Sequence, residues 1–195
     1  MATERRALRA SLRKLRRSVS ARERLAAGAR VAEYVDRAFP LRAGRRIALY
    51  ISTEEELDTA PLLALAHRRG CQMFLPHIDN YRSGRMSFRR EMATLKRNRF
   101  GILEPAGGQA LSSRWLDLVF VPVVGFDERG TRLGMGAGFY DRALAWRHTR
   151  KAWRGPRLIG LAYALQQVDS IAAQAHDVHL DAVVTEKGVL RCSTG

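Results

Sequence analysis

Long apolar runs and paired cysteines are both missing from this 195-residue sequence. It contains no run of about 18 apolar residues, which excludes a predicted transmembrane helix. Its two cysteines, Cys71 and Cys192, lie far apart and form no CxxC motif. A disulfide-rich scaffold and a cysteine-based zinc site are therefore excluded, and we expect a protein of the reducing cytoplasm.

A secretory signal is missing as well. The N-terminus reads MATERRALRASLRKLRRSVS and lacks the continuous apolar segment of such a signal. This segment is rich in arginine and poor in acidic residues. A mitochondrial transit peptide is therefore the alternative to a cytoplasmic location.

Acidic residues and lysines are scarce. The chain has 19 acidic residues against 34 lysines and arginines, a net charge of +15, and before residue 150 its only lysines are Lys14 and Lys96. The excess predicts attraction to polyanions such as nucleic acid, phosphorylated metabolites or polyglutamylated substrates. A general preference for arginine on solvated faces explains the same composition. Charge alone does not decide between these interpretations.

Sequence motifs of nucleic-acid-binding folds are also missing. The chain contains no RNP, KH, zinc-finger or homeodomain pattern. A basic nucleic-acid-binding module is still the non-enzymatic alternative. Hydrophobic residues make up 46% of the chain, which excludes general disorder and predicts a globular protein with one domain over residues 1–195.

Two basic helices are expected within residues 3–39. The first is indicated by an apolar stripe at helical spacing: Leu8, Leu12, Leu15 and Val19. The motif SARE, with Ser20 followed by Glu23, is a capping box and predicts the start of the second helix. This helix is expected to end at Pro40, and its predicted apolar positions are Leu25, Val31, Val35 and Phe39.

Strands and helices are expected to alternate along the rest of the chain. The expected strands are residues 45–52, 72–76 (ended by Pro76), 116–124, 157–163 and 182–186. Helices are expected over 59–70 and 140–150, and a loop over 95–113. This order predicts an α/β fold with a mostly parallel central sheet and helices on both faces. Ligands should bind at the carboxyl ends of the strands. One candidate site there is formed by four segments: TEEELD, the glycine segment RLGMGAGFYDRAL, YALQQV and His176–Asp177.

The segment RLGMGAGFYDRAL contains three alternating glycines, Gly134, Gly136 and Gly138. Without Cβ atoms, successive amides can point into one concavity that binds an anion, and a following helix adds its positive dipole end. Neither the P-loop pattern nor GxGxxG is present. A plain turn is the alternative. Asp141 would repel a phosphate there unless Mg²⁺ lay between them.

The run DLVFVPVVGFDERGTRLGMGAGFYDRAL resembles the signature of the 5-formyltetrahydrofolate cyclo-ligase family. The segments RRALR, STEEELDT, FGILEP and AHDVHLDAVVTE are similar to other family elements and occur in the family's order. The resemblance implies a fold of the kind shared by sugar-phosphate isomerases and CoA transferases. It also implies an ATP- and Mg²⁺-dependent conversion of 5-formyltetrahydrofolate, including polyglutamylated forms, to 5,10-methenyltetrahydrofolate by a monomer.

The same resemblance implies specific site residues. The expected ATP contacts are Arg5, Arg9, Arg132, Leu133, Gly134, Met135, Gly136, Ala137, Gly138, Phe139 and Tyr140. The expected folate contacts are Ile51, Glu56, Met135, Gly136, Ala137, Gly138 and Phe139. Arg132 and Tyr140 are expected to be catalytic, and Asp141 and Asp177 to be Mg²⁺ ligands.

Three positions depart from the family pattern. Ala137 stands where a basic residue is common, Phe139 where a tyrosine is common, and Arg5 where lysine is usual. Arginine and lysine differ as phosphate ligands. These departures predict weaker nucleotide binding, or an arginine from elsewhere in the chain beside the phosphates. A degenerate folate-binding paralogue is a further alternative.

Other residues have simpler interpretations. The acidic run Glu54–Glu56 could be a solvated surface. His176 and His179 form a conceivable zinc pair, but no third sulfur or nitrogen ligand lies nearby in the sequence. The tryptophans are expected to be packing or surface residues rather than a folate platform: Trp115, Trp146 and Trp153.

Overall fold

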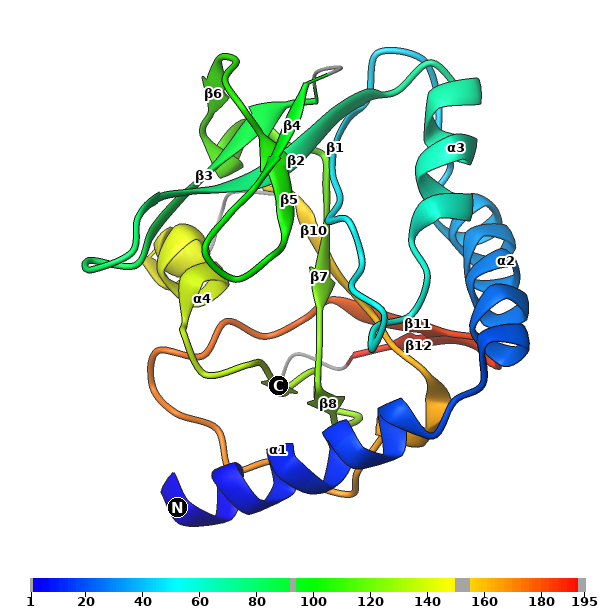
Figure 1. The fold of residues 1–195 in the computed structure, drawn as a ribbon, viewed down its shortest axis with the longest axis vertical. Coiled ribbons are helices and arrows are strands. Elements are labelled where there is room, and N and C mark those ends of the chain that lie inside the picture. Colours follow the sequence, from blue (N-terminus) through cyan, green and yellow to red (C-terminus); the bar gives the residue numbers. More distant parts are fainter. Residues whose placement is uncertain (1, 92–93, 150–154, 193–195) are drawn as a thin grey trace.

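A mixed eight-stranded sheet forms the centre of the protein (Figure 1). The computed structural model describes residues 2–91, 94–149 and 155–192. The strand order is β12-β11-β10-β7-β1-β2-β3-β6. The strands are β1 Arg46–Ala48, β2 Gln72–Asn80, β3 Arg85–Arg90, β6 Ala110–Leu111, β7 Leu118–Pro122, β10 Arg157–Leu161, β11 Ala182–Thr185 and β12 Gly188–Arg191. From β11 to β2 the strands are parallel, and antiparallel strands flank them at both edges.

Two apolar cores cover the two faces of this sheet. In the central strand β7, Leu118 and Phe120 belong to one core, while Val119 and Val121 belong to the other. All four side chains are 0–1% exposed. A strand buried on both faces reads as a continuous apolar run, which is why 116–124 predicted a central strand correctly.

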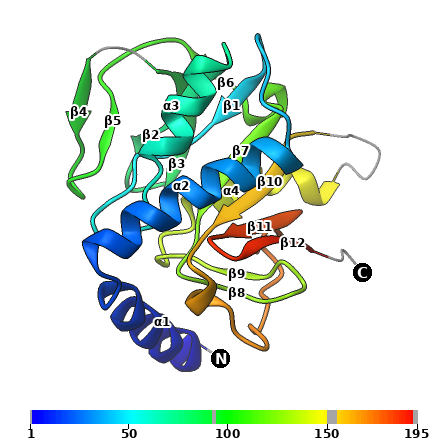
Figure 2. The same ribbon diagram turned by 90° about the vertical axis from the view of Figure 1, so that its right-hand side faces the viewer.

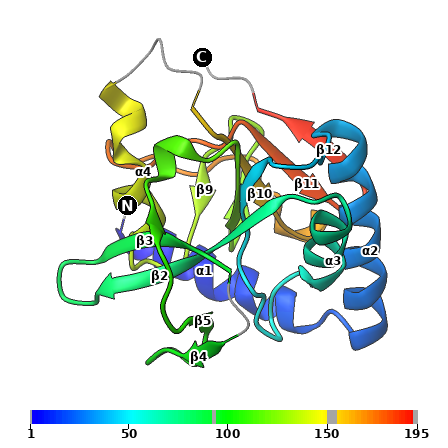
Figure 3. The ribbon, with the colours of Figure 1, turned by 90° about the horizontal axis from the view of Figure 1, so that it is seen from above.

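Helices lie on both faces, as the sequence predicts (Figure 2). Helices α2 (Ala21–Ala38) and α3 (Ala60–Arg68) pack together over one face, with Val31 and Val35 buried in the core. Helix α4 (Phe139–Leu144) lies on the other face, where Leu144 is fully buried. Figure 3 shows the two groups on opposite sides of the sheet.

The predicted capping box of α2 is confirmed. The Ser20 hydroxyl accepts the backbone N–H of Glu23, and the Glu23 carboxylate accepts the backbone N–H of Ser20 at 2.9 Å. The helix ends before Pro40, as expected. The predicted apolar stripe is wrong at Leu25, which is 59% exposed because the buried face of α2 is built from smaller residues such as Ala27.

Helix α1 (Ala2–Arg17) lies across the carboxyl ends of the parallel strands (Figure 1). Its apolar stripe is shorter than predicted. Leu12 is buried and Leu8 is partly buried in a small core with Val124. Leu15 is 45% exposed, which corrects the predicted stripe. Ion pairs with the loops therefore supply much of the attachment of this helix.

Other predicted elements differ in extent. Strand β2 continues through Pro76, which was expected to end it. Beyond Phe74, β2 pairs only with β3, so one edge of β2 has no neighbouring strand and the proline is tolerated there. Residues 95–113, expected as loop, contain β4 (Leu95–Arg97), β5 (Leu103–Pro105), β6 and the 3₁₀ turn Ser113–Trp115.

Two short hairpin elements were not predicted. Strands β8 (Gly125–Phe126) and β9 (Arg132–Leu133) form a hairpin around a turn at Asp127–Gly130, and β12 was missed. The helix expected over 140–150 is α4 followed by the 3₁₀ turn Ala145–Thr149, while Arg150 lies outside the described residues. None of the described helices has the length and apolarity required to cross a bilayer.

Candidate functional site

Loops that follow β1, β7 and β10 meet at the carboxyl end of the sheet, and α1 contacts all three. Arg9 Nε donates to Gly134 O at 2.7 Å in the glycine loop, residues 134–138. Arg5 Nη1 donates to Ala172 O at 2.7 Å. The loop after β1 is attached through Glu55. The sequence therefore predicted correctly that these loops lie together.

Glu55 fixes the acidic loop to α1. Its carboxylate accepts hydrogen bonds from three arginines of that helix, Arg13 at 3.2 Å, Arg16 at 3.2 Å and Arg17 at 2.7 Å. Burial raises the pKa of this carboxyl, but the bonds from Arg17, Arg13 and Arg16 outweigh it, so the pKa lies below its usual value. For Glu55, the interpretation as a solvated acidic run is wrong.

The glycine loop presents backbone amides that have no hydrogen-bond acceptor among the described residues. Within the described residues, the N–H groups of residues 135–138 donate no hydrogen bond. Gly138 has φ of +67°, a left-handed conformation that favours glycine, and it caps α4. The loop therefore combines open amides with the N-terminal end of a helix, the arrangement that binds anions.

Two loop carbonyls are held by guanidinium groups on either side. Arg9 binds the carbonyl of Gly134, and Arg142 Nη2 binds the carbonyl of Ala137. Each peptide unit is planar and trans, so its N–H points away from its C=O. The amides of Met135 and Gly138 therefore point away from these two arginines.

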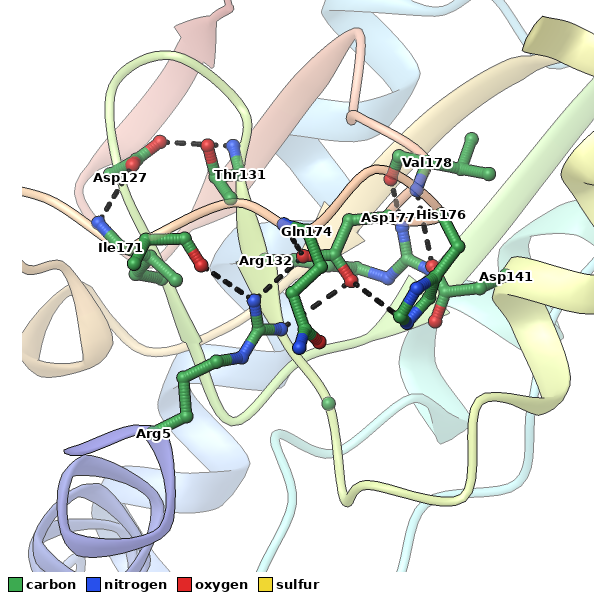
Figure 4. A network of polar contacts seen from close by, with 12 residues as sticks. Arg5, Asp127, Thr131, Arg132, Asp141, Ile171, Gln174, His176, Asp177 and Val178 are labelled. Carbon is green, nitrogen blue, oxygen red and sulfur yellow. Dashed lines mark hydrogen bonds and ion pairs between the residues drawn. The ribbon is translucent and has the colours of Figure 1, made fainter. Parts of the chain in front are cut away.

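Asp141 pairs with Arg132 (Figure 4). Arg132 Nη2 donates to Asp141 Oδ1 at 2.5 Å, and Arg132 Nη1 donates to the carbonyl of Val178. The backbone N–H of Val178 donates to the same Oδ1 at 3.2 Å. The buried Arg132 thus joins α4 to the segment before β11. Leu133 is fully buried beside Leu12, which leaves only its backbone near the site.

Asp177 pairs with Arg5 from the other end of the chain (Figure 4). Arg5 Nη1 donates to Asp177 Oδ2 at 2.7 Å, and the backbone N–H of Gln174 donates to it at 2.9 Å. Burial raises the pKa of Asp177, but these two donors outweigh it and keep its pKa below the usual value. Both expected metal ligands are therefore held by arginines that were expected to contact ATP.

The two carboxylates fit a hard cation that completes its coordination with phosphate and water. The described residues contain no cluster of three or more histidine, cysteine or acidic side chains suited to a metal, which leaves the His176–His179 zinc interpretation without support. Asp141 Oδ2 has no hydrogen bond to a described residue. Asp177 Oδ1 accepts a long hydrogen bond from Arg5 Nη2 at 3.4 Å and lies 4.0 Å from His176 Nε2. Each carboxylate thus keeps an oxygen available, and Mg²⁺ is commonly bound by one or two carboxylates plus phosphate oxygens.

Glu56 and Tyr140 lie near each other on another side of the site. Glu56 Oε2 accepts the N–H of Thr53 at 2.9 Å, and its backbone carbonyl accepts the Tyr163 hydroxyl at 3.2 Å. Burial raises the pKa of Tyr140, and the Glu56 carboxylate raises it further. Tyr140 is therefore a neutral phenol at physiological pH. Ile51, half-buried, precedes this loop.

An aromatic cluster beside the glycine loop was not predicted. Phe100, at the tip of the β4–β5 hairpin, packs edge-on against Phe139 at 6.3 Å and against Tyr81 at 5.6 Å between ring centroids. Arg99 lies over the Tyr81 ring at 4.1 Å. Met135, in the glycine loop, is 54% exposed. The segment FGILEP was the available signal, because it contains Phe100 and resembles a family element.

Trp115, Trp146 and a surface hollow lie away from this site. Trp146 donates to Ser113 Oγ at 2.8 Å, which confirms its packing role, while Trp115 is an exposed surface residue and Trp153 lies outside the described residues. Near Trp115 is a hollow of about 460 Å³ that no expected site residue lines. It lies at the amino ends of the strands, so it has no part in the site described above. Its other lining residues are Arg46, Gln72, Phe74, Arg90, Gln109, Ala110 and Leu111.

Known proteins resemble this chain over nearly its whole length. The sequence model of the 5-formyltetrahydrofolate cyclo-ligase family matches residues 1–186. A Haemophilus influenzae protein named 5-formyltetrahydrofolate cyclo-ligase is 33% identical over 183 residues, which cover 91% of this chain and 95% of the relative. A Mus musculus protein of the same name is 32% identical over 190 residues, covering 93% of each chain. The NMR structure of Aquifex aeolicus 5,10-methenyltetrahydrofolate synthetase superposes with a TM-score of 0.80 at 30% identity, covering 98% of this chain and 94% of that one.

Proposed function

The chain belongs to the 5-formyltetrahydrofolate cyclo-ligase family, and we propose that it converts 5-formyltetrahydrofolate and ATP to 5,10-methenyltetrahydrofolate, ADP and phosphate. The observation that carries the nucleotide part of this proposal is the glycine loop, whose amides at residues 135–138 have no acceptor among the described residues. We further propose that the enzyme is a cytoplasmic monomer.

The nucleotide phosphates bind the glycine loop and the arginines of α1. Burial lowers the pKa of Arg9, and the charge of Arg5 lowers it further, so two like charges lie close together. An anion between them would relieve this repulsion. Arg9 uses only Nε in its hydrogen bond to Gly134, which leaves its terminal nitrogens for a phosphate.

Asp141 and Asp177 would hold Mg²⁺ beside the phosphates, through the carboxylate oxygens that their arginine partners leave available. When bound, it neutralises charge on the phosphates during transfer. Arg132 holds Asp141 in place and is buried, so we assign it a positioning role toward this carboxylate. Arg5 is paired with Asp177 in the structure and can shift to the nucleotide when a cation takes its place.

The folate ring binds between the acidic loop and the aromatic cluster. Glu56 keeps an oxygen, Oε1, without a hydrogen bond to a described residue and can accept N–H groups of the pterin ring. Tyr140, as a neutral phenol, can donate a hydrogen bond to the substrate. Phe139 and Ile51 provide apolar contact. Together these residues orient the formyl oxygen toward the γ-phosphate.

The reaction needs activation of the formyl oxygen, because amide resonance makes the formyl carbon a poor electrophile. The formyl oxygen attacks the γ-phosphorus and ADP leaves. The neighbouring N–H nitrogen then attacks the formyl carbon, and phosphate departs with the former formyl oxygen and takes up the proton that this nitrogen loses. Arginines and open amides stabilise the charge that develops on the phosphoryl group, and positioning contributes the rest.

The proposal predicts stoichiometric formation of product and phosphate. With MgATP and 5-formyltetrahydrofolate, the absorbance of the methenyl product should rise and one phosphate should be released per product. Omission of ATP is the control and should give no product. A flat absorbance trace from folded protein would contradict the proposed activity.

A further inference from the structure

Arg142, in the last turn of the short helix α4, bridges two segments that are distant in sequence. Its Nε donates to the carbonyl of Gly84 at 3.1 Å, in the turn between β2 and β3. Its Nη2 donates to the carbonyl of Ala137 in the glycine loop. The guanidinium carbon also lies 5.7 Å from the ring centroid of Phe139. One side chain therefore joins the β2–β3 turn to the glycine loop.

Gly84 provides the space for this bridge. A Cβ atom built at Gly84 would lie 1.9 Å from Arg142 Nη2, and the residue has φ of +69°. The colliding atom is the end of a flexible side chain. A larger residue at Gly84 would therefore displace the guanidinium before it moved the backbone. The position of the Arg142 guanidinium therefore requires a residue without a side chain at Gly84.

We propose that Arg142 is a positioning residue that sets the conformation of the glycine loop for the nucleotide. By holding the Ala137 carbonyl against the β2–β3 turn, it orients the peptide unit between Ala137 and Gly138, so that the Gly138 amide points to the opposite side. This role requires that one planar guanidinium group binds both carbonyls, so a positive charge alone does not provide it. This inference rests on the proposed ATP dependence of the enzyme.

Steady-state kinetics distinguish this role from a general loss of active enzyme. Arg142→Ala should raise the KM for ATP about tenfold, the loss expected for a hydrogen bond to a charged group, with a smaller change in the KM for the folate. Gly84→Ala should raise the KM for ATP in the same direction although it lies on another turn. Combining the two should add little, because both remove the same bridge.

Matched controls isolate the bridge. Gly44→Ala places alanine at a similar left-handed position, φ +79°, where a Cβ meets nothing within 4 Å, so it should leave the KM for ATP unchanged. Arg142→Lys keeps the charge but should not restore wild-type KM. An unchanged KM in Arg142→Ala or Gly84→Ala, or full rescue by lysine, would overturn the inference.

A second readout does not depend on turnover. The amide chemical shifts of residues 135–138 in the ligand-free protein should change in Gly84→Ala as they do in Arg142→Ala, but not in Gly44→Ala. If the wild type shows no turnover, the proposed function fails while this measurement still tests the bridge. Chemical shifts in Gly84→Ala that match those of the wild type would overturn the bridge alone.

Discussion

Two residue pairs balance the charges of both expected metal-binding carboxylates in the absence of a ligand. Asp141 is paired with Arg132 and Asp177 with Arg5. If MgATP binds as proposed, a cation can replace Arg5 at its carboxylate while the released arginine contacts phosphate. Binding would then exchange one set of charge pairs for another. Such an exchange avoids leaving a buried charge without a partner.

Replacing one carboxylate should expose its role toward the metal. We expect Asp141→Asn to require about 10–100-fold more Mg²⁺ for half-maximal activity, since the amide is a weaker ligand. The measurement is a Mg²⁺ titration at saturating ATP and folate. A companion measurement, the Mg²⁺ concentration needed for nucleotide to raise the melting temperature, should shift in parallel.

Asp169→Asn, an exposed carboxylate with no side-chain contact among the described residues, is the matched control and should titrate like the wild type. An unaltered Mg²⁺ dependence in Asp141→Asn would remove this residue from the metal site.

At the scale of elements, α1 is docked mainly through polar contacts. Arg13, Arg16 and Arg17 converge on Glu55, and only Leu12 of the helix is fully buried as an apolar anchor. Because the same helix carries Arg5 and Arg9, its docking determines whether the nucleotide arginines are in place. Through Glu55, the loop after β1 therefore helps to fix the position of the arginines of α1 in the proposed nucleotide site.

The stability contributed by Glu55 should depend on pH. Its pKa is lower in the folded state than in the unfolded state, so the contribution is complete above the unfolded value and is lost as the pH falls through the folded value. We expect Glu55→Gln to lower the melting temperature at pH 7 but to differ less from the wild type near pH 3. Thermal melts across this range measure the difference.

Glu54→Gln, at the exposed neighbouring position, should follow the wild type at every pH. Glu55→Gln should also raise the KM for ATP, because a loosened α1 misplaces Arg5 and Arg9. A melting difference that stays constant with pH would argue against the ion pairs as its cause.

Elements with a local physical signal were predictable, and those that depend on a partner were not. The apolar run around Val119 and the capping box at Ser20 specify a buried strand and a helix start without knowledge of the neighbours. The continuation of β2 past Pro76 depends on which edge lacks a partner strand. The β4–β5 hairpin likewise depends on pairing between Leu95 and Pro105. The periodicity of apolar residues along the sequence carries no information about such pairing between distant segments.

The candidate site shows the same division. The rule that ligands bind at the carboxyl ends of parallel strands brought the right loops together. It did not reveal that Arg132 binds Asp141, or that Arg142 reaches the Gly84 carbonyl 58 residues away. With 34 basic residues in the chain, spacing alone does not specify which arginine meets which acceptor.

At the scale of the whole molecule, the net charge of +15 should favour polyanionic substrates. We expect the KM of a pentaglutamylated 5-formyltetrahydrofolate to rise more steeply with salt than that of the monoglutamate. Between about 50 and 300 mM NaCl the screening length shortens roughly twofold, which weakens attraction to a longer anion more. Initial rates at fixed MgATP measure both slopes.

Sucrose at equal osmolality is the control for effects unrelated to ionic strength. Identical salt slopes for the two substrates would mean that the excess charge lies on solvated faces without a role in substrate capture.

The contact between Arg5 and Asp177 spans 172 positions, so the guanidinium of α1 has no carboxylate partner until the ribosome has made the segment before β11. A nascent chain could fold β1, β2 and the helices that cover them well before it could recognise a nucleotide. Competence for ATP would then arrive only after the segment around Asp177 has been synthesised and has reached α1.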